Sequence, residues 1–186
     1  EVSYDGVKAV KADSKRLVET GCTSWLPTLE TSSGIKEVVQ YINEGSEGTD
    51  IPGFHMEGPF LAPKDIESIN GIDTGLEKPS LKRSKQFIEE ADGYLRIMGV
   101  SIELPGADEI IKELNKAGIV AAIAHSSHAS YEQFMRAVDL GIRHVTHTFN
   151  VMTGLHHRKP GVVGGALTCA QVTNEIISDG FHVSPV

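Results

Sequence analysis

Short apolar segments alternate with amphipathic ones along most of the chain. Two of the apolar segments are almost continuously hydrophobic, LRIMGV and IVAAIA, as expected for parallel strands that are covered on both faces. Together the pattern predicts six strands, at Cys22–Pro27, Ile51–Met56, Leu95–Val100, Ile119–Ala124, Ile142–Thr146 and Val172–Ser178.

The stretches between these strands have the spacing of amphipathic helices, with apolar residues recurring every three to four positions. They predict helices at Val7–Glu19, Ile35–Ile42, Leu81–Glu90, Ala107–Lys116 and Tyr131–Leu140. A glycine that signals the end of a helix follows the first, fourth and fifth of them, at Gly21, Gly118 and Gly141. Ser130 is the expected N-cap of the fifth. Alternating strands and helices predict a parallel sheet with right-handed crossovers.

Such a sheet could be an open doubly wound sheet or most of a (β/α)8 barrel. Polar residues capable of chemistry follow the carboxyl ends of several strands, namely Glu57, His125, His147 and the pair Asp179 and His182. Barrel enzymes build their active sites at that end. A doubly wound nucleotide-binding fold should carry a glycine-rich fingerprint, and neither GxGxxG nor GxxxxGK[ST] occurs. The sequence therefore predicts an α/β fold of the (β/α)8 TIM-barrel type, here incomplete.

Composition and charge exclude several classes of protein. The chain has 186 residues, of which 40% are hydrophobic and 23% charged, as in globular proteins with a core. Its net charge of −8 and the lack of a basic stripe argue against a nucleic-acid partner. No apolar run of about 18 residues predicts a membrane span, and no signal peptide is visible, so we expect a cytoplasmic location. Cys22 and Cys169 lack a CxxC companion and are expected to be reduced.

Glu57, His125 and His147 each follow an apolar strand. The two histidines are 22 residues apart (147 − 125), about one strand–helix unit, and neighbouring parallel strands lie about 4.8 Å apart. Each residue has an ordinary explanation, as a solvated turn carboxylate or a hydrogen-bonded core histidine. Their equivalent positions at strand ends instead favour one shared ion. Two imidazoles and a carboxylate are a familiar catalytic zinc set, which leaves a position open for water and lowers its pKa toward about 7.

Residues 144–161 concentrate basic side chains in an otherwise acidic chain. Within and after this segment, Asn150 can donate from its amide, Arg158 offers a planar fork for a phosphate or carboxylate, and His182 can donate or accept. A solvated surface loop is the alternative explanation for Arg158. The segment is also expected to continue as a loop whose backbone passes close to a ligand, at Gly161, Gly164 and Gly165.

Six motifs follow one another over essentially the whole chain: GCTSWLPTLETSS, GFHMEGPFLAP, AHSSHASYEQ, THTFNVM, HHRKPGVVGGAL and SDGFHV. Taken together they resemble the N-acetylglucosamine-6-phosphate deacetylase family of the amidohydrolase superfamily. The resemblance implies a barrel that removes acetate from N-acetyl-D-glucosamine 6-phosphate with a divalent metal, usually zinc, with iron, manganese or cobalt as alternatives. It implies that Glu57, His125 and His147 bind this metal.

By the same resemblance, Asn150, the backbone at Val151, Arg158 and His182 would hold the sugar phosphate. The arginine would reach the site of a neighbouring subunit, so a homodimer is expected. Residues 1–186 would form a partial catalytic barrel, strands two to seven of eight. The first and last strands and a flanking β domain would lie outside the chain, with the catalytic aspartate beyond Val186. We then expect the isolated chain to be inactive as a deacetylase.

The chain departs from the family pattern after EGPFLAPK, where a histidine usually helps to polarise the scissile carbonyl. Asn70 or Asp73 occupies that neighbourhood here. Two alternatives therefore stay open: a relative that acts on another amide substrate, and a non-catalytic fragment that binds metal or associates with itself.

Overall fold

The computed structural model describes residues 6–29, 34–63 and 76–186. Within them six strands form a single sheet in chain order, and every neighbouring pair is parallel. The strands are β1 (Thr28–Leu29), β2 (Phe54–Met56), β3 (Leu95–Val100), β4 (Val120–Ile123), β5 (His144–Val145) and β6 (Thr173–Asn174). The predicted parallel α/β sheet is confirmed.

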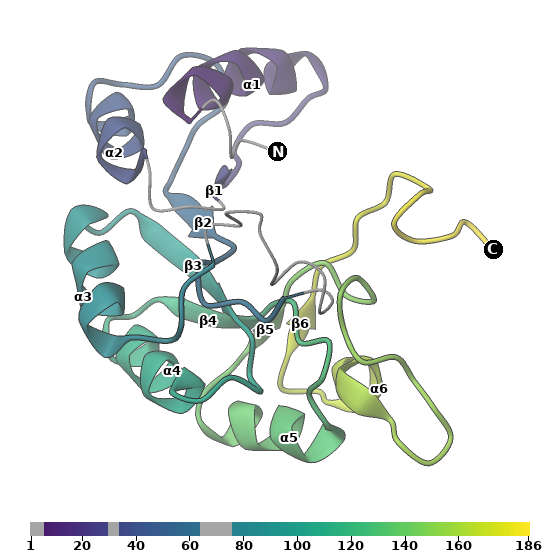
Figure 1. Ribbon diagram of the computed structural model, residues 1–186. Helices are drawn as coiled ribbons and strands as arrows, with labels where there is room; N and C mark the ends of the chain where they lie inside the picture. The colour runs from purple at the N-terminus through teal and green to yellow at the C-terminus, as the bar shows by residue number, and fades with distance from the viewer. Residues whose placement is uncertain (1–5, 30–33, 64–75) are drawn as a thin grey trace.

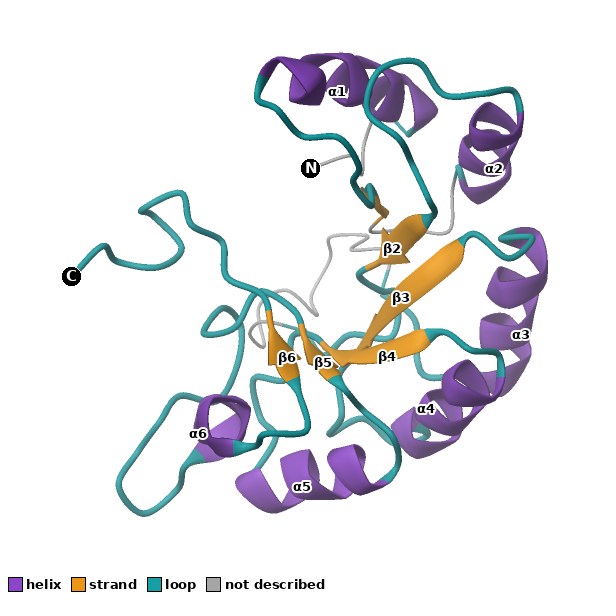
Figure 2. Ribbon diagram, turned by 180° about the vertical axis from the view of Figure 1, so that it is seen from behind, coloured by secondary structure: helices purple, strands orange, loops and turns teal. Residues whose placement is uncertain are grey.

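The helices lie outside the arc that the strands form, and the arc is open on the side where the C-terminal segment lies (Figures 1 and 2). They are α1 (Val7–Glu19), α2 (Ile35–Asn43), α3 (Leu81–Glu90), α4 (Ala107–Lys116), α5 (Tyr131–Asp139) and α6 (Gly161–Thr168). This is the arrangement of a partial (β/α) barrel. None of the described helices has both the length and the apolar character needed to cross a bilayer.

The two faces of the sheet differ in polarity because successive side chains of a strand point to opposite faces. Phe54, Met56 and Met98 are fully buried and belong to the core that the helices cover. On the other face, His55 is paired in register with Ile97, and His144 with Thr173. This inner, concave face therefore carries the polar side chains, and the candidate site lies at its carboxyl edge.

Most of the predicted helices have the predicted bounds. Helices α1, α3 and α4 begin and end where the pattern places them, and so does β3. Ser130 caps α5 as expected: its hydroxyl accepts from the backbone N–H of Gln133 at 3.2 Å, and the Gln133 side chain accepts from the Ser130 N–H at 2.8 Å. Local sequence signals are sufficient for these elements.

The first predicted strand is placed too early. Residues 22–27 form only an isolated bridge, between Ser24 and Asp50, and β1 begins at Thr28. Proline has no N–H to donate to a ladder, and Pro27 contributes only its carbonyl, which accepts from the N–H of His55 at 3.0 Å. Regular pairing therefore starts after the proline.

The glycine-rich loop prediction is also wrong, because Gly161–Thr168 is helix α6. Gly164 and Gly165 are buried in it, and a Cβ on Gly165 would lie 2.6 Å from Cγ of Phe134 on α5. The group that this backbone approaches closely is the aromatic ring of the neighbouring helix. Glycine at this position allows α5 and α6 to pack together.

Candidate metal centre

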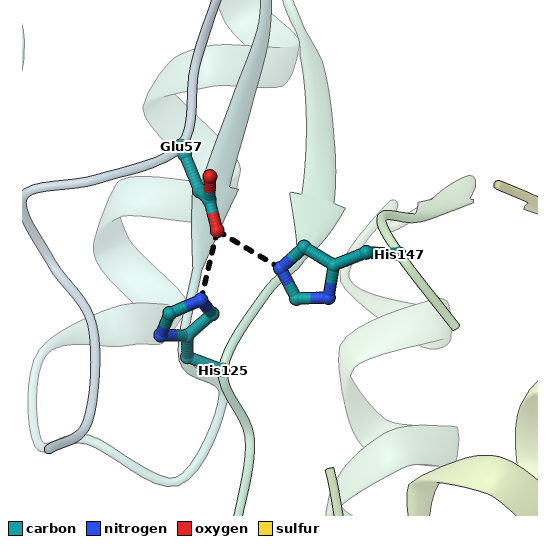
Figure 3. A group of neighbouring side chains, drawn as sticks. All are labelled: Glu57, His125 and His147. Carbon is teal, nitrogen blue, oxygen red and sulfur yellow. Dashed lines mark hydrogen bonds and ion pairs between the residues drawn. The ribbon is translucent and has the colours of Figure 1, made fainter. Parts of the chain in front are cut away.

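Glu57, His125 and His147 converge at the carboxyl ends of three strands (Figure 3). One oxygen of Glu57, Oε1, lies 2.8 Å from Nε2 of His125 and 2.9 Å from Nε2 of His147. The two imidazole centroids are 5.1 Å apart, and one ligand atom from each residue lies within 4.8 Å of the other two. The structure brings together three residues that are up to 90 positions apart in sequence.

All three side chains are largely shielded from solvent, with 19% of Glu57, 15% of His125 and 11% of His147 exposed. Burial by itself would raise the pKa of Glu57, but the hydrogen bonds and positive charge of the two histidines outweigh it and hold that pKa well below its usual range. Glu57 is therefore a carboxylate at neutral pH, which is the form that binds a cation.

The donor set fits a divalent metal ion. Two imidazole nitrogens and one carboxylate oxygen suit zinc and similar ions, and they leave room for at least one further ligand. Metal binding uses the lone pair of Nε2, so the ring proton must then sit on Nδ1. The Nδ1 of His147 is buried and has no hydrogen-bond partner among the described residues. None of these residues therefore holds the ring in the tautomer with the proton on Nε2, which could not bind a metal through that atom.

Both histidines leave their strands with a left-handed backbone, at φ 45° for His125 and φ 33° for His147. Phe149 and Val151 also have positive φ, so four of the five non-glycine residues of this kind in the described ranges lie here. Such conformations are unfavourable for residues with a Cβ and persist where the surroundings hold them, which is common at functional sites.

Gly99 of β3 and Ser101, just after this strand, lie between the ends of β2 and β4 and contact both. The buried Ser101 hydroxyl donates to the carbonyls of Ala124 and His125, both at 2.9 Å, and accepts from the N–H of Ala62 at 2.6 Å. A Cβ on Gly99 would lie 2.8 Å from the Glu57 carbonyl oxygen. The absence of a Cβ at position 99 and the hydroxyl at position 101 thus allow the segments that carry Glu57 and His125 to lie close together.

A second polar group on the concave face was not found from the sequence. The carboxylate of Glu175 accepts from Thr146 Oγ1 at 2.7 Å and lies 2.9 Å from His144 Nε2, and His144 Nδ1 lies 2.7 Å from Thr173 Oγ1. The hydrogen bond from His144, aided by Thr146, lowers the pKa of Glu175 to about 2. Nearby, burial lowers the pKa of His55. These residues carry no local motif, and only the strand register brings them together.

Two of the predicted substrate residues lie in the turn that follows His147. The side-chain amide of Asn150 donates to the His147 carbonyl at 3.3 Å, and its backbone N–H donates to the same oxygen at 3.0 Å. The Val151 carbonyl accepts from Ser127 Oγ at 3.3 Å. Asn150 therefore braces the backbone of a site histidine, whatever else it binds.

The other two predicted substrate residues are exposed. Arg158 lies in a projecting turn, where its backbone N–H donates to Nδ1 of His156 at 3.2 Å. His182 follows β6, and its Nδ1 lies 2.6 Å from Oδ2 of Asp179. Within the described part of the chain, neither side chain contacts the Glu57, His125 and His147 cluster through a hydrogen bond or ion pair.

The parallel (β/α) sheet carries one carboxylate and two histidines at its carboxyl edge, which is the edge where barrel enzymes build their active sites. The chain is 33% identical over 177 residues to the N-acetylgalactosamine-6-phosphate deacetylase of Escherichia coli O157:H7, a match that covers 89% of this chain and 45% of the relative. It is 31% identical over 182 residues to the N-acetylglucosamine-6-phosphate deacetylase of Bacillus subtilis (strain 168), a match that covers 93% of this chain and 45% of that relative. No family model matches the chain.

A solved structure agrees with these sequence matches. A mutant N-acetyl-D-glucosamine-6-phosphate deacetylase from Mycobacterium smegmatis, in complex with N-acetyl-D-glucosamine-6-phosphate, has a TM-score of 0.74 at 27% identity, covering 88% of this chain and 42% of that one. The resemblance to N-acetylglucosamine-6-phosphate deacetylases is thus confirmed. The chain spans about half the length of the curated relatives it matches.

Proposed function

We propose that the protein carrying this chain removes the acetyl group of N-acetyl-D-glucosamine 6-phosphate, giving glucosamine 6-phosphate and acetate. The observation that carries the proposal is the convergence of Glu57, His125 and His147 at one edge of the sheet. The sequence matches to sugar-phosphate deacetylases support it, as does the likeness to a structure that holds this substrate.

On this proposal Glu57, His125 and His147 hold a divalent ion, for which zinc is the best candidate and iron, manganese and cobalt are alternatives. When bound, such an ion supplies Lewis acidity toward the amide carbonyl and makes water more acidic. The residues of the chain provide the charge and the shape of the site: the ionised Glu57 offers a full negative charge, and the low exposure of all three side chains limits competing water.

The proposed substrate contacts are Asn150, the backbone at Val151, Arg158 and His182. Arg158 suits the phosphate because a guanidinium can bind two phosphate oxygens at once. Arg158 is exposed, as a residue that binds the substrate of a neighbouring subunit must be, so we propose a homodimer. We also propose that the protein acts in the cytoplasm. His182 receives its orientation from Asp179, which leaves Nε2 as the atom to meet the substrate.

We also propose that residues 1–186 are a partial catalytic barrel, in which β1–β6 are six of eight strands. The open arc of the sheet and the greater length of the relatives support this assignment (Figure 1).

Release of acetate from phosphorylated and unphosphorylated N-acetylglucosamine, measured on the full-length protein that carries this chain, tests the proposal. Arg158→Ala should lower kcat/KM for the phosphorylated sugar about 10- to 100-fold, the equivalent of one charge-assisted hydrogen bond, and leave the plain sugar unchanged. Lys159→Ala is the matched control, since it removes an exposed positive charge one residue away. An equal loss on both sugars would show that Arg158 does not bind phosphate. No acetate from either sugar with the full-length wild type would refute the deacetylase proposal.

A second substrate is favoured by one comparison. The relative from E. coli O157:H7 is named for N-acetylgalactosamine 6-phosphate, which differs from the glucosamine compound only in the configuration at C4. The segment in which this chain departs from the family motif, with Asn70 and Asp73, lies outside the described residues. The values of kcat/KM for the two sugar phosphates decide between them. A higher value for N-acetylgalactosamine 6-phosphate than for N-acetylglucosamine 6-phosphate would replace the primary assignment.

A further inference from the structure

The turn at His147 is strained and needs support from outside its own strand. His147 lies two residues beyond the end of β5 with φ 33°, a conformation that costs an ordinary residue about 1–2 kcal/mol. Unless neighbouring groups hold this turn, the imidazole is not fixed opposite Glu57. The residues on either side of His147, Thr146 and Thr148, are both almost fully buried.

Both threonines are tied to the end of β6, and Glu175 makes most of the bonds. Its backbone N–H donates to the Val145 carbonyl at 2.9 Å, and its carbonyl accepts from the Thr148 N–H at 2.8 Å. Its carboxylate accepts from Thr146 Oγ1 at 2.7 Å. Glu175 thus contacts the backbone before and after His147 and also the side chain just before it. No other residue in the described ranges bonds both neighbours of this histidine.

The carboxylate has a second role in the same place. Its other oxygen, Oε1, lies 2.9 Å from Nε2 of His144, so one oxygen contacts β5 and the other contacts Thr146, the residue just after it. The low pKa of Glu175 agrees with a carboxylate that has the His144 imidazole beside one oxygen and accepts a hydrogen bond from Thr146 on the other. One side chain thus makes an ion-pair contact at position 144 and a hydrogen bond at position 146, and both restrain the direction in which the chain leaves β5 toward His147.

We propose that Glu175 is a positioning residue that holds His147 in the geometry needed to bind a cation with Glu57 and His125. The inference rests on the proposed metal site. Glu175 does not bind the ion itself; it acts through Thr146 and the backbone. Groups that orient the ligands of a metal typically change its affinity by 10- to 100-fold when they are removed.

Three substitutions separate the side-chain bonds of Glu175 from its backbone bonds. Glu175→Ala removes both carboxylate bonds and keeps the backbone ladder. Glu175→Gln keeps one carbonyl oxygen that can accept from Thr146. Thr146→Val removes the hydroxyl at almost constant volume and leaves the carboxylate beside His144. Glu113→Ala is the matched control, because Glu113 is a mostly buried glutamate of α4 that faces Lys85.

The experiment is a Co²⁺ titration of each variant, followed by calorimetry and by the visible spectrum of the bound ion, with unfolding by urea recorded in parallel. Glu175→Ala and Thr146→Val should weaken binding about 10- to 100-fold and alter the spectrum, Glu175→Gln should stay within about threefold of the wild type, and Glu113→Ala should match it. Rescue by glutamine is the outcome that a loss of stability alone would not produce.

Two failures can be told apart. Wild-type affinity and spectrum in both Glu175→Ala and Thr146→Val would overturn the positioning role while leaving the metal site intact. Binding by the wild type that His147→Ala does not weaken would show that the ion lies elsewhere, and would overturn both the site and the inference.

Discussion

Gly165→Ala should destabilise the protein, because of the aromatic ring that lies against this glycine. A Cβ at position 165 would lie 2.6 Å from Cγ of Phe134, against 3.4 Å or more in ordinary contacts. Phe134 is fully buried, so its ring can move only by displacing other core residues. The substitution therefore adds a methyl group where the packing between α5 and α6 leaves no room.

Two opposing effects set the magnitude. Overpacking a core by one methyl group costs about 1–3 kcal/mol, and the large overlap at Gly165 places this site in the upper half of that range. Alanine inside a helix is favoured over glycine by about 1 kcal/mol. The net loss in the free energy of unfolding should be about 1–2 kcal/mol.

Urea unfolding of four proteins tests this reasoning: wild type, Gly165→Ala, Phe134→Ala and the double variant. With the ring removed, Gly165→Ala should stabilise the protein by about 1 kcal/mol, since only the helix preference remains. The sign of the effect should thus reverse between the two backgrounds. A neutral or stabilising Gly165→Ala in the presence of Phe134 would refute the packing explanation and revive a ligand-approach role for this glycine.

Three further predictions concern single side chains. Ser101→Ala should lower stability by about 1–3 kcal/mol in urea unfolding, because the buried N–H of Ala62 loses its acceptor. Ser130→Ala should cost about 1 kcal/mol by the same measurement, through loss of the capping box with Gln133. The pKa of Glu175 is lowered to about 2 in the folded protein, so its contribution is complete above about pH 4.5 and is lost as the pH falls toward 2. Because 43% of this side chain is exposed, we expect the carboxylate to contribute only about 1 kcal/mol to the free energy of unfolding. Urea unfolding of the wild type between about pH 4.5 and 2 should show this loss, and Glu175→Gln, which does not titrate, should not.

The sequence predicts best what depends on local signals. The helix at Tyr131–Asp139 has its capping serine, amphipathic spacing and a following glycine within a dozen residues. The convergence of Glu57, His125 and His147 was also predictable, because parallel strands end at one edge of a sheet and each residue follows a strand.

What the sequence does not reveal depends on packing and register. The buried glycines of α6 have poor helix propensity, so the segment resembles a loop until Phe134 on α5 explains why Gly165 is needed. Glu175 meets Thr146 only because β6 pairs with β5 in one register, and a shift of one residue would turn its carboxylate to the helix-covered face. Neither feature leaves a pattern within a short window of sequence.

The most direct test of the account is the binding of Zn²⁺ to the purified protein and to Glu57→Ala, His125→Ala and His147→Ala, measured by calorimetry and by metal analysis after dialysis. If these three residues form a metal centre, each substitution should remove the same tight binding event, while the folded state, monitored by circular dichroism, persists. Tight binding that survives all three substitutions would contradict the account.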